Sequence, residues 1–295
     1  MLKKQMKKKV KPFDVVNNTF LIIIGILCLF PLVHITALSF SSGYAIDSNM
    51  VKLWPVEFTL EPYTFVVTEP AFYAAFFVTV KRTVLGVLIN MLLTILAAYP
   101  LSKSKQVFHK RQIYVWFFMF AILFSGGLIP WYIVISKTGL IDTIWALVLP
   151  SAVPVWNIIL LHNFFKALPP SIEESAVMDG ATPWQVLFKI YVPLSKASLA
   201  TLTLFAAVGH WNEWFAGMIL MNRPSNYPLQ TYLQSVLVQR DLNLASLSEV
   251  ESLLEVSQRN SNAAKIIIAM LPILLIYPFL QKHFAKGMIL GSVKG

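Results

Sequence analysis

The segment Ser171-Ile-Glu-Glu-Ser-Ala-Val-Met-Asp-Gly180 lies between two strongly apolar stretches of this 295-residue chain, and its spacing decides which fold we expect. Ser171, followed three residues later by Glu174, is the pattern of a capping box and predicts a helix that begins directly after two prolines. Gly180 can end this helix, because glycine adopts the left-handed conformation of a helix C-terminus at low cost. The segment therefore predicts a short helix within a polar loop.

A second helix start follows in the same loop. Thr182, Pro183 and Gln185 supply an N-cap, a proline at the first helical position and an amide three residues after the cap. We expect this helix to run from Pro183 to about Tyr191 and to be ended by Pro193. The two patterns together predict a helix, a tight turn and a second helix.

The spacing of this loop resembles the cytoplasmic loop shared by membrane subunits of bacterial ABC importers. The family pattern is Glu-Ala-Ala, a glycine after three more residues, and Ile-x-Leu-Pro after nine more. Here Glu174-Ser175-Ala176, Gly180 and Ile190-Tyr191-Val192-Pro193 stand at those spacings, with Ser175 and Val192 as small conservative departures. Capping residues and a glycine alone would also fit an ordinary surface loop, which is the alternative interpretation.

The resemblance covers nearly the whole chain, from about Phe13 to Gly295. Within the family, the chain is similar to the carbohydrate-uptake branch, in particular to its smaller, maltose-type permease subunit. Beyond the loop it is carried by Asp179-Gly180-Ala181, Trp211-Asn212-Glu213 and the ending Lys286-Gly287 with Gly291 to Gly295. It implies a type I ABC importer transmembrane-domain fold whose loop docks on a separate ATPase. The implied ATPase-coupling residues are Glu174, Ser175, Ala176, Asp179, Gly180, Ile190 and Pro193. Ile172, Ala176, Val177 and Met178 are the expected contacts in a groove of that ATPase.

The composition independently indicates a membrane protein. Hydrophobic residues make up 57% of the chain and charged residues 13%, and the mean hydropathy is +0.66. Because a span needs about 20 apolar residues and lipid offers the backbone no hydrogen-bond partners, we predict an all-α membrane protein with six transmembrane helices. The expected spans lie near residues 20–40, 76–101, 113–135, 143–165, 197–220 and 263–281.

The basic residues predict the orientation of the chain. Sixteen of the 24 Lys and Arg residues fall in the amino-terminal tail, two alternate loops and the carboxyl tail, and five fall in the opposite loops. We therefore expect a multi-pass protein of the bacterial cell membrane with both termini cytoplasmic. Residues 1–19 form a basic cytoplasmic tail, residues 20–281 the six-span domain with a cytoplasmic coupling loop at 168–196, and residues 282–295 a cytoplasmic tail.

The net charge of +10 follows from this topology and gives little support to a nucleic-acid partner. The six lysines between Lys3 and Lys11 are expected to hold the first span against anionic lipid of the bilayer. They precede an apolar run that is too long for the alternative, a cleaved secretory signal. The single Cys28 excludes an internal disulfide, and the five histidines show no metal-ligand spacing, so no metal site is predicted.

The chain has no Gly-x-x-x-x-Gly-Lys-Ser/Thr phosphate loop, so we expect no cofactor on it and no enzymatic site of its own. The resemblance implies that ATP and Mg are held by a nucleotide-binding ATPase dimer. It also implies a second permease subunit, which would complete a heterodimer, and a separate extracytoplasmic sugar-binding protein. The outer loop near residues 223–262 is expected to contact that binding protein.

Glu213 is the one formal charge that we expect well within a span, and such a residue faces a cavity or a partner rather than lipid. With Trp211, Asn212 and Trp214 it is a candidate for the solute pathway, because aromatic and hydrogen-bonding groups suit sugars. The four residues are consecutive and point around the helix, so a structural role between helices is an equal alternative.

The function that we predict is that of an ATP-driven importer subunit that moves a sugar, specifically an oligosaccharide, into the cytoplasm. An importer subunit for a non-sugar solute is the first alternative. An ion-coupled secondary transporter is the second, although it would need several intramembrane carboxylates where this chain offers Glu213.

Overall fold

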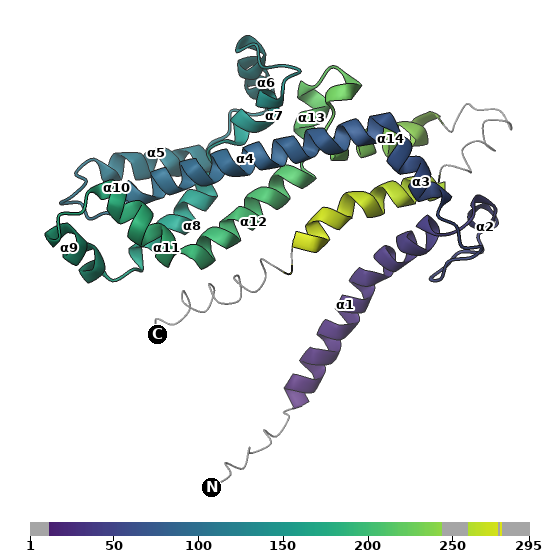
Figure 1. Ribbon diagram of the computed structural model, residues 1–295, viewed down its shortest axis with the longest axis horizontal. Coiled ribbons are helices and arrows are strands. Elements are labelled where there is room, and N and C mark those ends of the chain that lie inside the picture. Colours follow the sequence, from purple (N-terminus) through teal and green to yellow (C-terminus); the bar gives the residue numbers. More distant parts are fainter. Residues whose placement is uncertain (1–11, 244–258, 277, 279–295) are drawn as a thin grey trace, which may run out of the picture. The chain divides into compact units, whose positions relative to one another are not determined.

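The structure, a computed structural model, describes residues 12–243, 259–276 and 278 (Figure 1). Helices build this part of the chain, and the one pairing of extended backbone within it is an isolated bridge between Ser41 and Phe58. Two compact units are present, residues 1–68 with 243–268 and residues 69–242 with 269–295. The predicted all-α class is therefore confirmed. Residues 1–11 of the predicted basic tail and the carboxyl tail 282–295 lie outside the described residues.

The first unit contains the long helix α1 (Pro12–Ser39), the short helices α2 (Gly43–Asp47) and α3 (Glu61–Thr68), and the beginning of a helix over Arg259–Ile276. Of the α1 side chains only Ala37 and Ser39 are buried. A helix that is apolar on all sides and exposed along most of its length requires lipid or another protein around it.

The second unit is built around α4 (Pro70–Ser102), a helix of 33 residues. The helices α5 (Arg111–Leu123), α6 (Leu128–Lys137), α7 (Ile144–Val148) and α8 (Val155–Lys166) follow it. Next come α9 (Pro170–Met178), α10 (Pro183–Val186), a π-helical turn over Leu187–Tyr191 and α11 (Val192–Leu194). The helices α12 (Lys196–Asn212) and α13 (Phe215–Leu220), a 3₁₀ turn over Pro224–Asn226 and α14 (Leu229–Asn243) follow. Helix α4 packs along α8 and α12.

Helix α4 turns mainly small and polar residues inward and exposes large apolar residues on its other side. Its buried residues recur every three or four positions on one face: Phe72, Ala75, Thr79, Arg82, Gly86, Asn90, Thr94, Ala98 and Leu101. Val84, Leu88 and Leu92 are exposed. This arrangement is typical of helices in lipid, where small residues allow close packing and polar groups bond between helices.

Three unbroken helices are long and apolar enough to cross a membrane, namely Pro12–Ser39, Pro70–Ser102 and Arg259–Ile276. Three bent pairs qualify if each is counted as one span, which agrees with the six predicted spans. The predicted spans 113–135 and 143–165 are each interrupted by a bend, and the third pair joins the predicted loop helix to the beginning of the fifth span. Helices α5 and α6 meet at 113°, the segments Ile144–Ser151 and Val155–Lys166 at 46°, and the segments Pro183–Leu194 and Lys196–Asn212 at 82°.

Side chains of α4 satisfy backbone groups that these interruptions leave without a helical partner. The amide nitrogen of Asn90 donates to the carbonyls of Ser151 and Ala152 at 2.8 and 3.0 Å, where the helix before α8 ends. Arg82 Nη1 donates at 2.8 Å to the carbonyl of Glu213, directly after α12. Thr79 Oγ1 accepts the backbone N–H of Leu229 at the start of α14, at 2.6 Å. Helix breaks can therefore lie within this unit without orphaned backbone groups at these positions.

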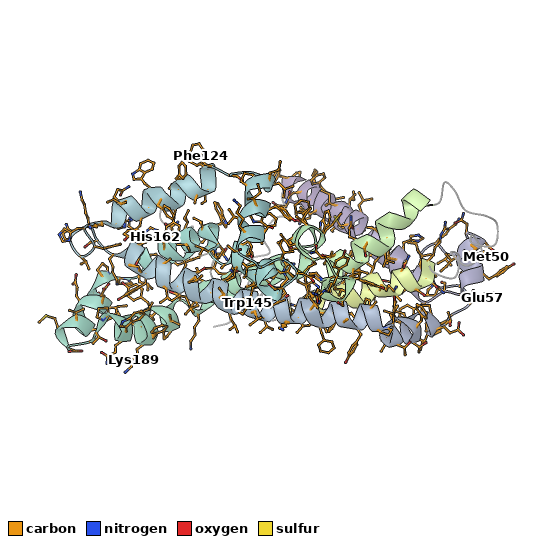
Figure 2. The ribbon with its side chains drawn as sticks, turned by 90° about the horizontal axis from the view of Figure 1, so that it is seen from above. Met50, Glu57, Phe124, Trp145, His162 and Lys189 are labelled. Carbon is orange, nitrogen blue, oxygen red and sulfur yellow. The ribbon has the colours of Figure 1, made fainter. Side chains whose placement is uncertain are left out.

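The outside of the second unit is strongly apolar. Phe124 at the end of α5 and Trp145 in α7 are both exposed, and Figure 2 shows apolar side chains of this kind around the helices. Such a surface is suited to lipid or to a neighbouring membrane protein.

Gly86 allows α4 and α12 to approach each other. A Cβ atom at this position would overlap the imidazole ring of His210. We expect Gly86→Ala to lower the unfolding free energy by about 1–3 kcal/mol through overpacking, measured as a lower unfolding temperature of the detergent-purified protein. Gly209→Ala on α12 is the matched control, because a Cβ atom there meets nothing within 4 Å. Equal unfolding temperatures for the two variants would contradict the close packing.

Candidate functional site

The predicted helix–turn–helix is present as α9 and α10, which lie at one end of α4, whereas α13 and α14 lie towards its other end (Figure 1). We call residues 170–191 the docking hairpin. Its core side is continuous with an apolar core of the unit, because Val186, Leu187 and Tyr191 are buried there against α4 and α8. The hairpin is therefore packed onto the helices that precede and follow it.

The first capping box was predicted wrongly. Helix α9 begins at Pro170 with Pro169 as the preceding cap residue, and no side chain caps it. Ser171 is already the second helical residue, and its carbonyl accepts a hydrogen bond from Ser175 Oγ at 2.9 Å. A proline at the first helical position has its φ angle preset and carries no N–H to satisfy, so Pro170 starts the helix before a serine cap is needed.

The turn between the two helices is confirmed. Gly180 has a φ angle of +81°, its N–H donates to the carbonyl of Val177 at 3.0 Å, and Ala181 donates to the carbonyl of Ala176 at 2.9 Å. These two bonds form a Schellman motif, in which the left-handed residue is almost always glycine.

The second capping box is also confirmed, but Pro193 does not end the helix. Thr182 N–H donates to Gln185 Oε1 at 2.8 Å, and Gln185 N–H donates to Thr182 Oγ1 at 3.4 Å. The helical chain continues through Pro193 to Leu194 because the preceding turn is π-helical. Wider π-turns relieve the clash between a proline ring and the carbonyl of the turn before it.

Glu173 attaches the docking hairpin to the rest of the unit. Its carboxylate pairs with Lys103 Nζ at 2.5 Å and accepts the hydroxyl of Tyr191 at 2.6 Å. The Lys103 ammonium group also lies over the rings of Tyr99 and Tyr191, 3.9 and 4.2 Å from their centroids. Burial lowers the pKa of Lys103, and the hydrogen bond and charge of Glu173 oppose that shift. No sequence pattern indicated this group of contacts, because Lys103 and Glu173 are 70 positions apart.

The exposed face of the hairpin carries the residues expected to meet a partner. Met178 is 86% exposed, Val177 is 56% exposed and Ile172 is 38% exposed. Glu174, Ser175, Asp179, Gly180 and Pro193 are exposed, whereas Ala176 and Ile190 are partly buried against the apolar core. The predicted coupling residues therefore divide into an outward group and an inward group, and their coupling role stays a prediction.

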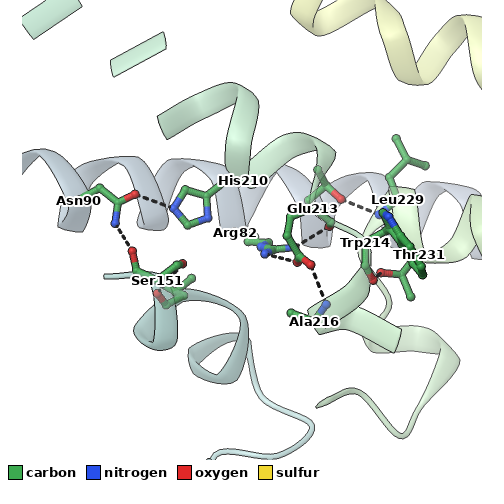
Figure 3. A network of polar contacts seen from close by, with 11 residues as sticks. Arg82, Asn90, Ser151, His210, Glu213, Trp214, Ala216, Leu229 and Thr231 are labelled. Carbon is green, nitrogen blue, oxygen red and sulfur yellow. Dashed lines mark hydrogen bonds and ion pairs between the residues drawn. The ribbon is translucent and has the colours of Figure 1, made fainter. Parts of the chain in front are cut away.

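A cavity of about 720 Å³ lies inside the second unit, between α4, α7, α12 and α13 and the loops before α6 and α8. Its wall contains a polar network that includes Arg82, Asn90, His210 and Glu213 (Figure 3). Arg82 is the thirteenth residue of α4, so the prediction that Glu213 is the one formal charge well within a span was wrong. The sequence interpretation placed Arg82 near the start of the second span, because the apolar stretch was taken to begin at residue 76.

Glu213 and Arg82 stabilise the break between α12 and α13. Arg82 Nη2 pairs with Glu213 Oε2 at 2.5 Å while Nη1 bonds the Glu213 carbonyl. The other carboxylate oxygen, Oε1, accepts the N–H of Ala216 at 2.7 Å in the first turn of α13 (Figure 3). The arginine side chain is 3% exposed and that of Glu213 33% exposed, so the carboxylate is the more accessible of these two groups in the cavity wall.

The other three pathway candidates do not line this cavity. Trp211 is buried against Phe76, and its Nε1–H donates to the carbonyl of Ala269 at 3.0 Å. Asn212 is exposed, and Trp214 packs edge to face against Phe215. Their role in a pathway remains a prediction, while Asn90 and His210 stand in the cavity wall instead. The described residues contain no group of three His, Cys, Asp or Glu side chains that could hold a metal ion.

Asp142 joins two loops at the end of the unit that carries α13. Its Oδ1 accepts hydrogen bonds from the backbone N–H groups of Asn222 and Arg223 and from the Asn226 side chain, at 3.1, 3.2 and 3.0 Å. Its Oδ2 pairs with Arg223 Nε at 3.1 Å. The Asn226 hydrogen bond is the largest cause that lowers the pKa of Asp142, followed by the two backbone hydrogen bonds and the charge of Arg223.

The chain resembles known proteins along nearly its whole length. A family model described as "Binding-protein-dependent transport system inner membrane component" matches residues 13–290. The chain is 38% identical over 283 residues to the polygalacturonan/rhamnogalacturonan transport system permease protein YtcP of Bacillus subtilis (strain 168), covering 96% of this chain and 98% of that protein. It is 40% identical over 283 residues to protein LplC of the same organism, covering 96% and 95%. A solved chain of a bacterial ABC transporter involved in the import of the acidic polysaccharide alginate matches with a TM-score of 0.84 and 31% identity, covering 96% of this chain and 100% of that one.

The contacts of Glu173 predict a local difference between neighbouring carboxylates. Glu173→Gln removes the charge that compensates Lys103, so we expect backbone amides of residues 172–191 to exchange hydrogen about tenfold faster. Glu174→Gln is the matched control, since Glu174 is exposed and forms no side-chain hydrogen bond or ion pair within the described residues. The measurement is hydrogen exchange followed by mass spectrometry, and equal exchange in both variants would argue against the anchor.

The contacts of Asp142 predict a pH dependence. Because its folded pKa lies below the ordinary value of 3.8, its contribution to stability is present above about pH 3.8 and is lost as the pH falls through the folded pKa. We expect the unfolding temperature of the wild type to fall more steeply between pH 5 and 3 than that of Asp142→Asn. Parallel curves for the two proteins would contradict a stabilising carboxylate.

Proposed function

The chain belongs to the family of binding-protein-dependent transport system inner membrane components, and from this premise we propose that it is the permease subunit of an ATP-driven importer for an oligosaccharide. Family membership makes it a multi-pass membrane protein and argues against an ion-coupled secondary transporter. It also makes the subunit a part of a larger assembly, whose other members supply what this chain lacks.

The observation that carries the proposal is the docking hairpin. Met178 and Val177 project from a helix that Glu173 fixes to Lys103 and Tyr191. An exposed apolar tip on a firmly held helix fits a groove of a partner protein. We assign this partner to the nucleotide-binding ATPase dimer, which holds ATP and Mg, while this chain binds no cofactor and has no catalytic residues of its own.

The anchor also explains how a partner could move the spans. A push on α9 reaches the end of α4 through the Glu173–Lys103 ion pair and reaches the π-turn before α12 through Tyr191. Tyr191 itself packs edge to face against Tyr99 and Phe165, with centroids 5.2 and 5.3 Å away. Closure of an ATPase dimer would thereby favour one of two arrangements of α4, α8 and α12.

The cargo is assigned from the relatives. Relatives named for polygalacturonan or rhamnogalacturonan transport and for alginate import share 38% and 31% identity with the chain over nearly its whole length. Both cargoes are saccharides, which favours an oligosaccharide over the alternative of a non-sugar solute. The remaining parts of the assembly are a second permease subunit, which completes a heterodimer, and an extracytoplasmic sugar-binding protein.

The proposal includes the orientation of the chain. The docking hairpin, both termini and the coupling loop 168–196 face the cytoplasm, as the distribution of lysine and arginine favours. The loops joined by Asp142 then face outward, where the sugar-binding protein would dock. The exposed surfaces of α1 and α5 are suited to the lipid bilayer and to the second permease.

Met178→Asp tests the docking hairpin. A carboxylate at the exposed tip would enter the groove without a partner, so we expect at least tenfold less ATPase to co-purify with the tagged chain. Met50→Asp is the matched control, since Met50 is an exposed methionine in the first unit, between α2 and α3.

The same two variants, expressed in a strain from which the gene for this chain has been deleted, test the transport function. A deletion strain is supplied with a digest of neutral and acidic plant oligosaccharides, and uptake is followed by mass spectrometry. We expect the deletion to abolish uptake of at least one oligosaccharide, the wild type and Met50→Asp to restore it, and Met178→Asp to fail. Undiminished uptake of the whole digest by the deletion strain would overturn the saccharide assignment, and full ATPase recovery with Met178→Asp would overturn the docking assignment.

A further inference from the structure

The cavity in the second unit has a wall that is uncharged in total. Among the residues that line it, Arg82 and Glu213 are the two with a formal charge, and they are paired with each other. The cavity volume of about 720 Å³ lies within the range of about 300–1,000 Å³ that is typical of small-molecule sites. The cavity is therefore large enough for a solute and carries no excess charge that would select an ion.

The Glu213 carboxylate retains hydrogen-bonding capacity towards the cavity. Arg82 occupies one lone pair of Oε2, and the N–H of Ala216 occupies one lone pair of Oε1. Each carboxylate oxygen can accept two hydrogen bonds, so both oxygens can accept another. Because the carboxylate is partly exposed at the cavity wall, it presents acceptors to whatever enters.

His210 adds a second acceptor. The Asn90 amide nitrogen donates to two backbone carbonyls, which fixes Asn90 Oδ1 as the partner of His210 Nε2 at 2.9 Å. The hydrogen-bond network thus assigns the proton of the neutral ring to Nε2, and Nδ1 is then an acceptor. Gly86 is required for this position of the ring, since a Cβ atom would overlap it.

Aromatic side chains line the same cavity. Trp131, Phe205 and Phe215 belong to its wall together with Glu213 and His210. Apolar ring faces combined with a few fixed polar groups are the usual composition of a small-molecule site. Hydroxyl donors on a ring whose C–H faces are apolar complement this wall, whereas a carboxylate would meet acceptors.

We propose that this cavity is a solute-contacting site on this chain, which binds the hydroxyl-bearing face of a sugar ring through Glu213 and His210. The site rests on the proposed import function and goes beyond it, because it assigns cargo contact to this subunit and states which face of the cargo it takes. Carboxylate groups of an acidic sugar point away from this wall. Arg82 and Asn90 act as positioning residues that hold the two acceptors.

Gly209 offers a test that leaves the polar network intact. It lines the cavity, and a Cβ atom there meets nothing within 4 Å. Gly209→Leu fills cavity space from α12, so we expect at least a tenfold loss of uptake with the ATPase still bound. Gly25→Leu on α1 is the matched control, because a Cβ atom there also meets open space. Wild-type uptake by Gly209→Leu would overturn the site.

A labelling experiment covers the possibility that Gly209→Leu fails to assemble. Cys28 is the single cysteine of the chain, so Gly209→Cys in a Cys28→Ser background places one thiol at the cavity wall. In the assembled importer, the oligosaccharide whose uptake the deletion abolishes should slow modification of this thiol by a methanethiosulfonate reagent at least threefold. An unchanged rate at saturating oligosaccharide would overturn the site.

Glu213→Gln separates solute contact from a purely structural role. The variant leaves the charge of Arg82 unpaired at the cavity wall, so uptake of acidic relative to neutral oligosaccharides from the digest should rise at least threefold. A lower total uptake with an unchanged ratio would show that Glu213 only supports the helix break. A wild-type strain whose uptake equals that of the deletion strain would instead overturn the import function, so the two failures are distinguishable.

Discussion

The structure depends on one constraint, which is that lipid supplies no hydrogen bonds to a polypeptide. An interrupted helix in such surroundings must find partners for its free backbone groups within the protein. In the second unit these partners stand on α4, where Thr79, Arg82 and Asn90 bond backbone groups at the start of α14, after α12 and before α8. The polar stripe of one long helix thereby permits three others to be short, bent or broken. The cavity exists because these breaks are satisfied.

A second group of contacts connects the docking hairpin to the other end of α4. Glu173 joins Lys103 and Tyr191, and the rings of Tyr99 and Phe165 surround Tyr191. The docking hairpin is consequently part of the helical packing rather than a loose loop. A partner that binds its tip acts on α4, α8 and α12 together, which is the property that an energy-coupling subunit needs.

Local signals predicted local structure well. The cap at Thr182 and the left-handed turn at Gly180 depend on residues within a few positions, and both were read from the sequence. The cap at Ser171 failed because an adjacent proline offered an earlier start. The roles of Arg82, Asn90 and Glu173 were not predicted, because their partners lie 131, 61 and 70 positions away and no periodicity connects them. The family fold could be predicted from the spacing of the loop motif. The polar residues of the cavity wall could be identified only from the structure.

The polar residues on the buried face of α4 must meet two opposing requirements. Entry of a segment into the bilayer favours apolar side chains, so replacing Asn90 with leucine would make α4 easier to insert. The same replacement would leave the carbonyls of Ser151 and Ala152 without their donor once the helices assemble. At position 90, the substitution that favours membrane insertion therefore destabilises the assembled helices. Suppose that substitutions on this face of α4 are ranked by membrane insertion alone in order to improve expression. The selected chains would enter the membrane readily but fold there poorly.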